Sequence, residues 1–95
     1  MMSMRIELKE KNQNMQLRIK KLANTCNITR IDGNEYFGNG NENDFEKFAL
    51  FMIKLIEDKE FLDNCSLWHW DEWEEDNEHY VDDVLEEIRL RKNKK

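Results

Sequence analysis

The chain has no proline, and its three glycines all lie between residues 33 and 40. Glycine adopts backbone angles that other residues avoid, and proline lacks an N–H, so these two residues most often interrupt regular structure. Chain reversals that need unusual backbone angles are therefore expected in this one short region. The rest of the 95 residues should form regular helices and strands within a single small domain spanning residues 1–95.

The segment before the glycines has the alternation of β-strands. Met4, Ile6 and Leu8 alternate with polar residues, which is the period-two pattern of a half-buried strand. The same alternation recurs at residues 15–19, after a polar stretch at residues 11–14. It predicts a second strand that pairs antiparallel with the first.

Two further strands are predicted around the first glycine. β-Branched residues between positions 25 and 31 favour a third strand, and Asp32-Gly33 predicts a tight turn into a short strand that ends near Phe37. The outward face of this sheet is expected to hold much of the positive charge of the chain. The residues expected there are Arg5, Lys9, Arg18, Lys20 and Arg30.

The segment after the glycines has the 3.6-residue period of α-helices. Apolar residues recur on one face from Phe45 to Ile56, with Asn43 as the expected N-cap and Glu46 in capping-box position. More apolar residues widen this face, so a helix over residues 43–58, extending to about residue 63, should pack on two sides. A second helix is predicted at residues 76–91, with an apolar stripe at Tyr80, Val81, Val84, Leu85 and Ile88.

The predicted fold class is α+β. A small antiparallel sheet of three to four strands, at about residues 3–37, is expected to precede the two helices, which pack on one of its faces. Nothing in the period of the sequence indicates a repeat.

Charge is strongly segregated along the chain. Residues 57–87 hold fourteen carboxylates and one cation, Lys59, for a formal charge of −13 in a chain of −6. Like charges on one surface repel each other, whereas a fixed anionic surface attracts a cationic partner and can occupy a groove built for phosphates. The pattern favours a basic partner over the alternative, a solvated face that only aids solubility.

Three tryptophans lie between the two predicted helices. In an extended segment Trp68 and Trp70 share a face, whereas on a helix Trp70 and Trp73 are neighbours. Tryptophan is frequent both in cores and at binding hot spots. We expect a mixture of the two roles, with at least one tryptophan buried.

Metal binding and catalysis find little support in the sequence. Cys65, His69 and His79 could ligate zinc with Cys26 or an acidic residue as the fourth ligand, but no Cys-x2-Cys pair is present, so no metal site is expected. The two cysteines are expected to be small core residues without a disulfide. Neither a phosphate-binding loop nor a nucleophile elbow occurs, so we expect no cofactor and no enzymatic activity.

The chain is also expected to stay away from membranes. Residues 1–4 lead directly into charged, alternating residues, and the longest apolar run, residues 48–53, is too short to cross a bilayer. A cytoplasmic protein is predicted, in the host cytoplasm if the gene belongs to a phage. The negative net charge argues against direct nucleic-acid binding, despite the basic residues between positions 89 and 95.

One stretch resembles a known family. Asp32-Gly33-Asn34-Glu35-Tyr36, followed by Glu42-Asn43 and Glu46-Lys47-Phe48, resembles the small acidic anti-CRISPR proteins that inhibit type II effector nucleases by mimicking DNA. The acidic stretch that ends in Glu78-His79-Tyr80 is similar in kind to the family's link into its last helix. The chain departs from the family pattern by starting in a strand and by having a longer, Trp-rich link.

The resemblance implies a role for the turn. In the family this run bears on the site where the nuclease recognises the PAM, so Asp32, Asn34 and Glu35 would face arginines here. The prediction is an acidic inhibitor that binds the basic nucleic-acid-binding site of a partner by DNA mimicry, most sharply a phage anti-CRISPR protein that blocks an RNA-guided nuclease. An immunity or antitoxin protein against a basic nuclease toxin is the alternative. The predicted partner-binding residues are Asp32, Asn34, Glu35, Tyr36, Trp70, Asp71, Glu72, Trp73, Glu74, Glu75, Asp76 and Glu78.

Overall fold

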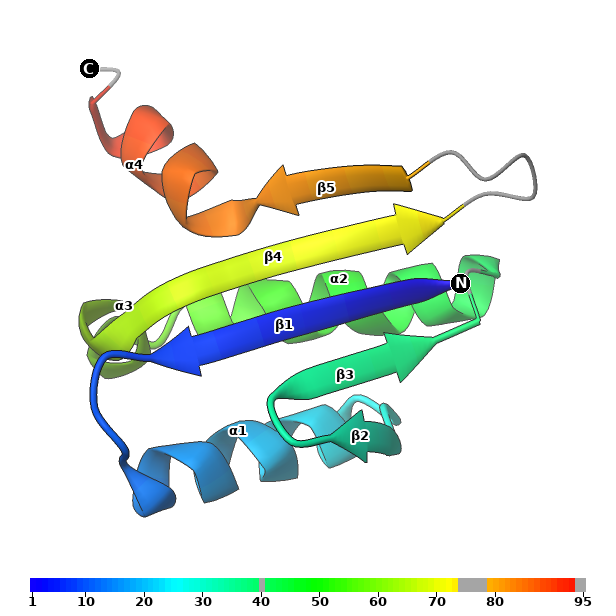
Figure 1. Cartoon of the computed structure of the whole chain (residues 1–95), viewed down its shortest axis with the longest axis horizontal. Helices are drawn as coiled ribbons and strands as arrows, with labels where there is room; N and C mark the ends of the chain where they lie inside the picture. Colours follow the sequence, from blue (N-terminus) through cyan, green and yellow to red (C-terminus); the bar gives the residue numbers. More distant parts are fainter. Residues whose placement is uncertain (40, 74–78, 94–95) are drawn as a thin grey trace.

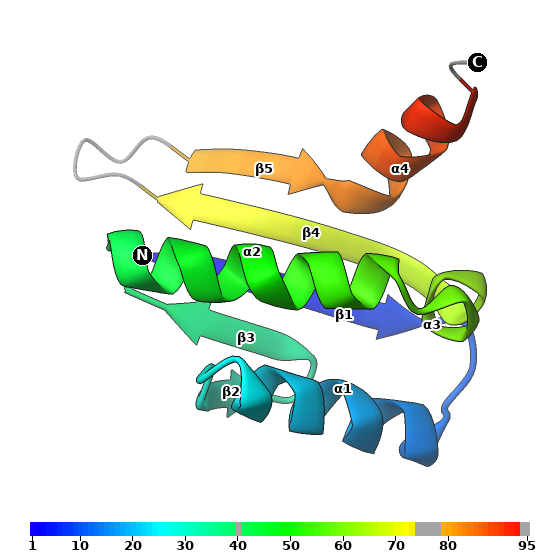
Figure 2. The ribbon, with the colours of Figure 1, turned by 180° about the vertical axis from the view of Figure 1, so that it is seen from behind.

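A computed structural model describes residues 1–39, 41–73 and 79–93, which form a five-stranded antiparallel sheet and four helices (Figure 1). Figures 1 and 2 show α1 and α2 on the same face of the sheet. The α+β class and the antiparallel sheet are as predicted. In chain order the elements are β1 (Met2–Leu8), α1 (Gln13–Thr25), β2 (Arg30–Asp32), β3 (Glu35–Gly38), α2 (Glu42–Ile56), α3 (Lys59–Asn64), β4 (Cys65–Trp73), β5 (His79–Asp83) and α4 (Val84–Asn93).

The strand order, β2-β3-β1-β4-β5, makes β1 the centre of the sheet. With α1 and α2, the first four strands have the split β-α-β connectivity, in which β3 lies between β1 and β2. Met4 in β1 is opposite Tyr36 in β3 and Trp70 in β4. Because side chains alternate along a strand, all three face the helices together.

The core lies between the sheet and the helices. Tyr36 packs on Phe51 of α2 with ring centres 5.2 Å apart, and Phe61 of α3 meets Trp68 edge to face at 5.3 Å. Both cysteines are free and buried in this core, as expected of small apolar residues. The expectation of at least one buried tryptophan is confirmed, since Trp68 and Trp70 are both buried.

Residues 15–19 form part of α1, so the prediction of a second strand there is wrong. Met15, Ile19 and Ala23 are buried four residues apart on one helix face, whereas Leu17 is 56 % exposed. Apolar residues four positions apart fit both the two-residue period of a strand and the 3.6-residue period of a helix. The Asn12 side chain favours the helix, because it caps the first turn by accepting the Met15 N–H at 3.0 Å. Two basic residues expected on the sheet therefore lie on this helix: Arg18 and Lys20.

The third strand is also shorter than predicted. Residues 26–29 follow the end of α1, with Asn27 at a φ of 63°, and β2 begins at Arg30. The turn predicted at Asp32-Gly33 is confirmed, because Gly33 has a φ of 61° between β2 and β3.

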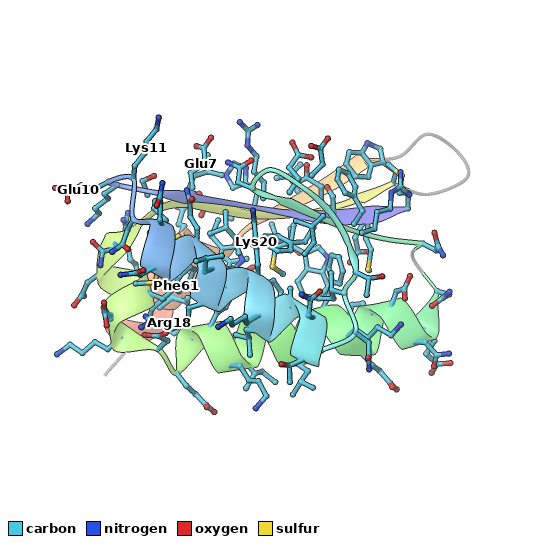
Figure 3. All side chains as sticks on the ribbon, turned by 90° about the horizontal axis from the view of Figure 1, so that it is seen from below. Glu7, Glu10, Lys11, Arg18, Lys20 and Phe61 are labelled. Carbon is cyan, nitrogen blue, oxygen red and sulfur yellow. The ribbon has the colours of Figure 1, made fainter. Side chains whose placement is uncertain are left out.

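The first predicted helix becomes two helices. Helix α2 confirms the predicted helix over residues 43–56 and begins slightly earlier, at Glu42. Its N-cap is Asn41, whose side chain accepts the Asp44 N–H at 2.8 Å, so the prediction of Asn43 as the cap is wrong. A second helix, α3, replaces the expected extension to residue 63. Asp58 caps it, accepting the Phe61 N–H at 3.1 Å, and its carboxylate also lies 2.9 Å from Arg18. Figure 3 shows Arg18 and Phe61 on the helix side of the sheet.

The last helix begins at Val84, eight residues later than predicted. Residues 79–83 form β5 instead, so Tyr80 and Val81 belong to a strand. The Trp-rich segment, expected as a link between helices, is β4 and pairs with β1 along its length. The two helices therefore do not simply follow the sheet, because two strands return to it after α3. None of the described helices is long and apolar enough to cross a membrane.

Candidate partner-binding face

The sheet has a second surface, opposite α1 and α2, which we call the open face. The alternation that buries Met4 and Ile6 directs Arg5 and Glu7 to this side, and Figure 3 shows Glu7 there, across the sheet from α1. The strand register extends the face over all five strands. Its other described residues are Ser3, Arg30, Asp32, Glu35, Phe37, Leu67, His69, Asp71, Trp73, Val81 and Asp83.

One row of the open face crosses the whole sheet. Asp32 of β2, Glu35 of β3, Arg5 of β1, His69 of β4 and Asp83 of β5 are paired in register. Neighbouring strands lie about 4.8 Å apart, so the row is about 19 Å long. Carboxylates stand at both of its ends, with the arginine in the middle.

The open face is acidic. Its described residues include five carboxylates and two arginines, for a formal charge of −3 with histidine neutral. Arg5 lies 3.0 Å from Glu7, and the guanidinium of Arg30 lies 5.1 Å from the centre of the Phe37 ring. Half of the Arg5 side chain remains exposed. The face nevertheless keeps a net negative charge, with Asp32 exposed and 37 % and 46 % of the Glu7 and Asp83 side chains accessible.

Asp83 is positioned by two contacts with neighbouring residues. One of its oxygens accepts the Glu86 N–H at the start of α4 at 3.1 Å, and the other lies 3.9 Å from the His69 imidazole. The two contacts hold Asp83 at the edge of the face while 46 % of its side chain stays exposed.

Four predicted site residues converge on this face from two distant segments. Asp32 and Glu35 come from the β2–β3 hairpin, and Asp71 and Trp73 come from β4, on the other side of β1. Asn34 is exposed in the hairpin turn, where its carbonyl accepts the Ile6 N–H at 3.0 Å. The turn is thereby fixed to the central strand.

The remaining predicted residues lie elsewhere. Tyr36 and Trp70 are buried against α2 and support the face from beneath, and Glu72 has the helix-side register. The predicted residues Glu74, Glu75, Asp76 and Glu78 lie outside the described residues. The acidic stretch is also not one surface, since Asp58 and Glu60 pair with Arg18 on the helix side.

Sequence reasoning placed Arg5 on the outward face of the sheet but missed three other members of the open face: Glu7, His69 and Asp83. The alternation in β1 does give the side of Arg5 and Glu7, but their neighbours follow only from the strand order. Asp83 was missed because its segment was predicted as helix.

Zinc ligation by Cys65 and His69 is not favoured by the strand geometry. Cys65 pairs with Leu8 on the core side, whereas His69 pairs with Arg5 on the open face. Burial raises the pKa of the Cys65 thiol to about 11, and burial also raises the pKa of Cys26, so neither thiol is readily ionised. Within the described part of the chain no three His, Cys, Asp or Glu residues are grouped to hold a metal ion.

A cleft of about 530 Å³ opens beside the β2–β3 turn, between α1 and the end of β1. Ile6, Ile19 and Tyr36 contribute apolar walls, and its rim includes Lys20 and Glu7. Figure 3 shows Lys20 on the α1 side and Glu7 on the sheet side of this region. The mixed charge of the rim contrasts with the acidic open face.

The chemistry of the open face is that of its carboxylates, since its one serine is buried. Ser3 is the hydroxyl nearest to His69 in the register, but it is 3 % exposed between Phe37 and Asp71, so a substrate could not reach it. Exposed carboxylates on rigid strands are instead ligands for cations or cationic side chains. Comparisons with protein-family models, curated proteins and solved structures gave no match for the chain.

Proposed function

We propose that the protein is an acidic inhibitor that binds the basic nucleic-acid-binding site of a partner protein by DNA mimicry. The sharpest form of the proposal has an RNA-guided type II CRISPR nuclease as the partner. The observation that carries it is the convergence of Asp32, Glu35 and Asp71, from distant segments, on one open sheet face. Glu7 and Asp83 extend that acidic surface along β1 and β5.

The chemistry of the face supports this partner class. A carboxylate accepts two parallel hydrogen bonds from an arginine, as a phosphate does, so arginines that bind DNA also bind carboxylates. A PAM site that uses arginines on base edges presents such donors. Glu7 and Asp83 keep 37 % and 46 % of their side chains exposed, so their oxygens are accessible to these donors.

The rigidity of the face supports it as well. The carboxylates stand on paired strands, and Asp83 and Asn34 are tied by hydrogen bonds to α4 and β1. Charges that are fixed before binding lose less conformational freedom on association. Inhibition by occupation of a DNA site needs such a preformed array.

The test uses two matched triple variants. Asp32→Asn, Glu35→Gln and Asp83→Asn neutralise the open face, and asparagine at position 83 still provides a helix cap. Glu10→Gln, Asp63→Asn and Glu87→Gln form the control, because these exposed carboxylates lie in the β1–α1 loop, in α3 and in α4. Each triple raises the formal charge by three.

The measurement is fluorescence anisotropy of labelled, PAM-containing DNA with a guide-loaded type II nuclease. The wild type should displace the DNA, less strongly as ionic strength rises, and the control triple should match it. The open-face triple should displace DNA at least about tenfold less well, since losing a charge pair with a partner costs more than 1.4 kcal/mol. Inhibition of a basic nuclease toxin instead would favour the immunity or antitoxin alternative. Failure to displace nucleic acid from either enzyme would reject the proposal.

A further inference from the structure

Helix α2 leaves an apolar surface exposed. Phe48, Phe51 and Leu55 face the sheet, but the second packing partner expected for this helix does not cover its outer side among the described residues. Figure 2 shows α2 in front of the sheet, with its outer side toward the viewer. The exposed apolar side chains are Phe45 (49 %), Leu50 (45 %), Ile53 (50 %) and Ile56 (36 %).

Charges flank this surface in a self-complementary pattern. Glu46 and Lys54 are both exposed and lie four residues before and four residues after Leu50. Each is therefore about 6 Å along the helix axis from Leu50, in opposite directions. A second α2, packed antiparallel about a two-fold axis at Leu50, would place Lys54 of each copy opposite Glu46 of the other.

We propose that the protein forms a two-fold symmetric homodimer in which α2 packs antiparallel against α2 of a second copy. A two-fold interface must be complementary to itself, and the Glu46–Leu50–Lys54 pattern satisfies that condition with two equivalent ion pairs. Antiparallel helices also oppose their dipoles, so each N-terminus lies near the partner's C-terminus. Leu50 and Ile53 form the apolar centre of the interface.

The dimer is compatible with the open face but does not depend on its function. Figure 3 shows α2 at one side of the molecule and Glu7 on the far side of the sheet. Two copies joined through α2 would therefore direct their open faces away from each other. Each open face would remain accessible, and the pair would be bivalent.

Sedimentation equilibrium of the full chain tests the dimer. The wild type should associate reversibly to two copies, and Leu50→Glu with Ile53→Glu should be monomeric with an unchanged circular dichroism spectrum, because both side chains are exposed. Monomeric wild type at every concentration, or a dimer that survives both substitutions, would overturn the proposal.

Charge reversal tests the orientation. Glu46→Lys and Lys54→Glu should each raise the dimer dissociation constant about tenfold or more, since each creates two like-charge contacts. The double variant should return it to near the wild-type value. Glu10→Lys and Lys20→Glu, at exposed sites that line the cleft beside the end of β1, are the matched controls and should leave it unchanged. Single variants that weaken the dimer without rescue by the double variant would overturn the antiparallel arrangement.

Discussion

The two faces of the sheet are made by the same strands and differ in almost every other respect. In β4 the side chains of Trp68 and Trp70 enter the core, while His69 and Asp71, one residue further each time, lie on the open face and are half-buried. A sequence that looks like one aromatic and acidic cluster is therefore two surfaces with separate tasks. Trp68 and Trp70 stabilise the fold from the core side, whereas the open side combines carboxylates with Trp73.

The energies of the two faces differ as much as their composition. A buried aromatic side chain removes about 150–250 Å² from water, which is worth about 4–6 kcal/mol before entropy is counted. An exposed ion pair such as Arg5–Glu7 contributes about 0.2–1 kcal/mol. Substitutions on the core side should therefore change stability, and substitutions on the open face should change mainly binding.

The largest expected effect comes from neighbours in β4. Trp68→Ala should lower the free energy of unfolding by about 3–5 kcal/mol, because it leaves a cavity against Phe61. His69→Ala, one residue away on the open face, should lower it by less than about 1 kcal/mol. Urea unfolding followed by circular dichroism measures both. Equal losses at the two positions would show that the faces are not energetically distinct.

The stability that comes from the core side of the sheet should also depend on pH in the alkaline range. Burial raises the pKa of Tyr36 to about 12, above its ordinary value of 10.0, so the unfolded chain releases this proton at lower pH than the folded chain. Stability from this group is complete below pH 10 and falls as pH rises toward 12, by roughly 2–3 kcal/mol in total. Tyr36→Phe should remove that part of the pH dependence. Cys65, whose pKa is about 11, is present in both proteins and cancels in the comparison. Parallel stability curves for the two proteins between pH 9 and 12 would contradict the assignment.

Sequence alone could give the class of the fold but not its topology. The alternation at Met4, Ile6 and Leu8 and the helical period of α2 were strong enough to assign both elements. Residues 15–19 were ambiguous, because five residues fit either period when the buried positions are four apart. The distinguishing evidence, Asn12 as a cap and continuation of the stripe to Ala23, lies outside that short window.

The candidate site could be predicted only in pieces. Asp32, Glu35 and Asp71 were selected from charge and resemblance, but their adjacency depends on β1 lying between β3 and β4. Strand order arises from contacts between residues far apart in the chain, which local periods do not contain. Asp83 was missed for a local reason, because residues 80–83, which end β5, also fit the start of a helix.

A moderate effect is expected at the turn that holds two carboxylates on the open face. Gly33 has a φ of 61°, and a Cβ there would meet nothing within 4 Å, so any cost comes from the backbone alone. Gly33→Val should lower stability by about 1–2 kcal/mol, whereas Gly33→Asn should cost less, because asparagine adopts this conformation more readily. Thermal unfolding compares them, and equal melting temperatures for both variants and the parent would exclude backbone strain at this turn.

The smallest change in stability, and the sharpest separation of the two faces, is expected from Arg5→Gln. Arg5 stands in the middle of the acidic row, beside Glu7 and opposite Glu35, with half of its side chain exposed. Its loss should lower the free energy of unfolding by no more than about 1 kcal/mol, and by less at high salt, because the pair is exposed and screened.

The same substitution should strengthen the proposed binding, since Arg5 competes with the partner's arginines for the same carboxylates. Association should become faster at low ionic strength, and a stopped-flow comparison with the wild type measures it. Slower association would mean that Arg5 itself contacts the partner, and the face would then be a mixed-charge surface rather than a substitute for DNA.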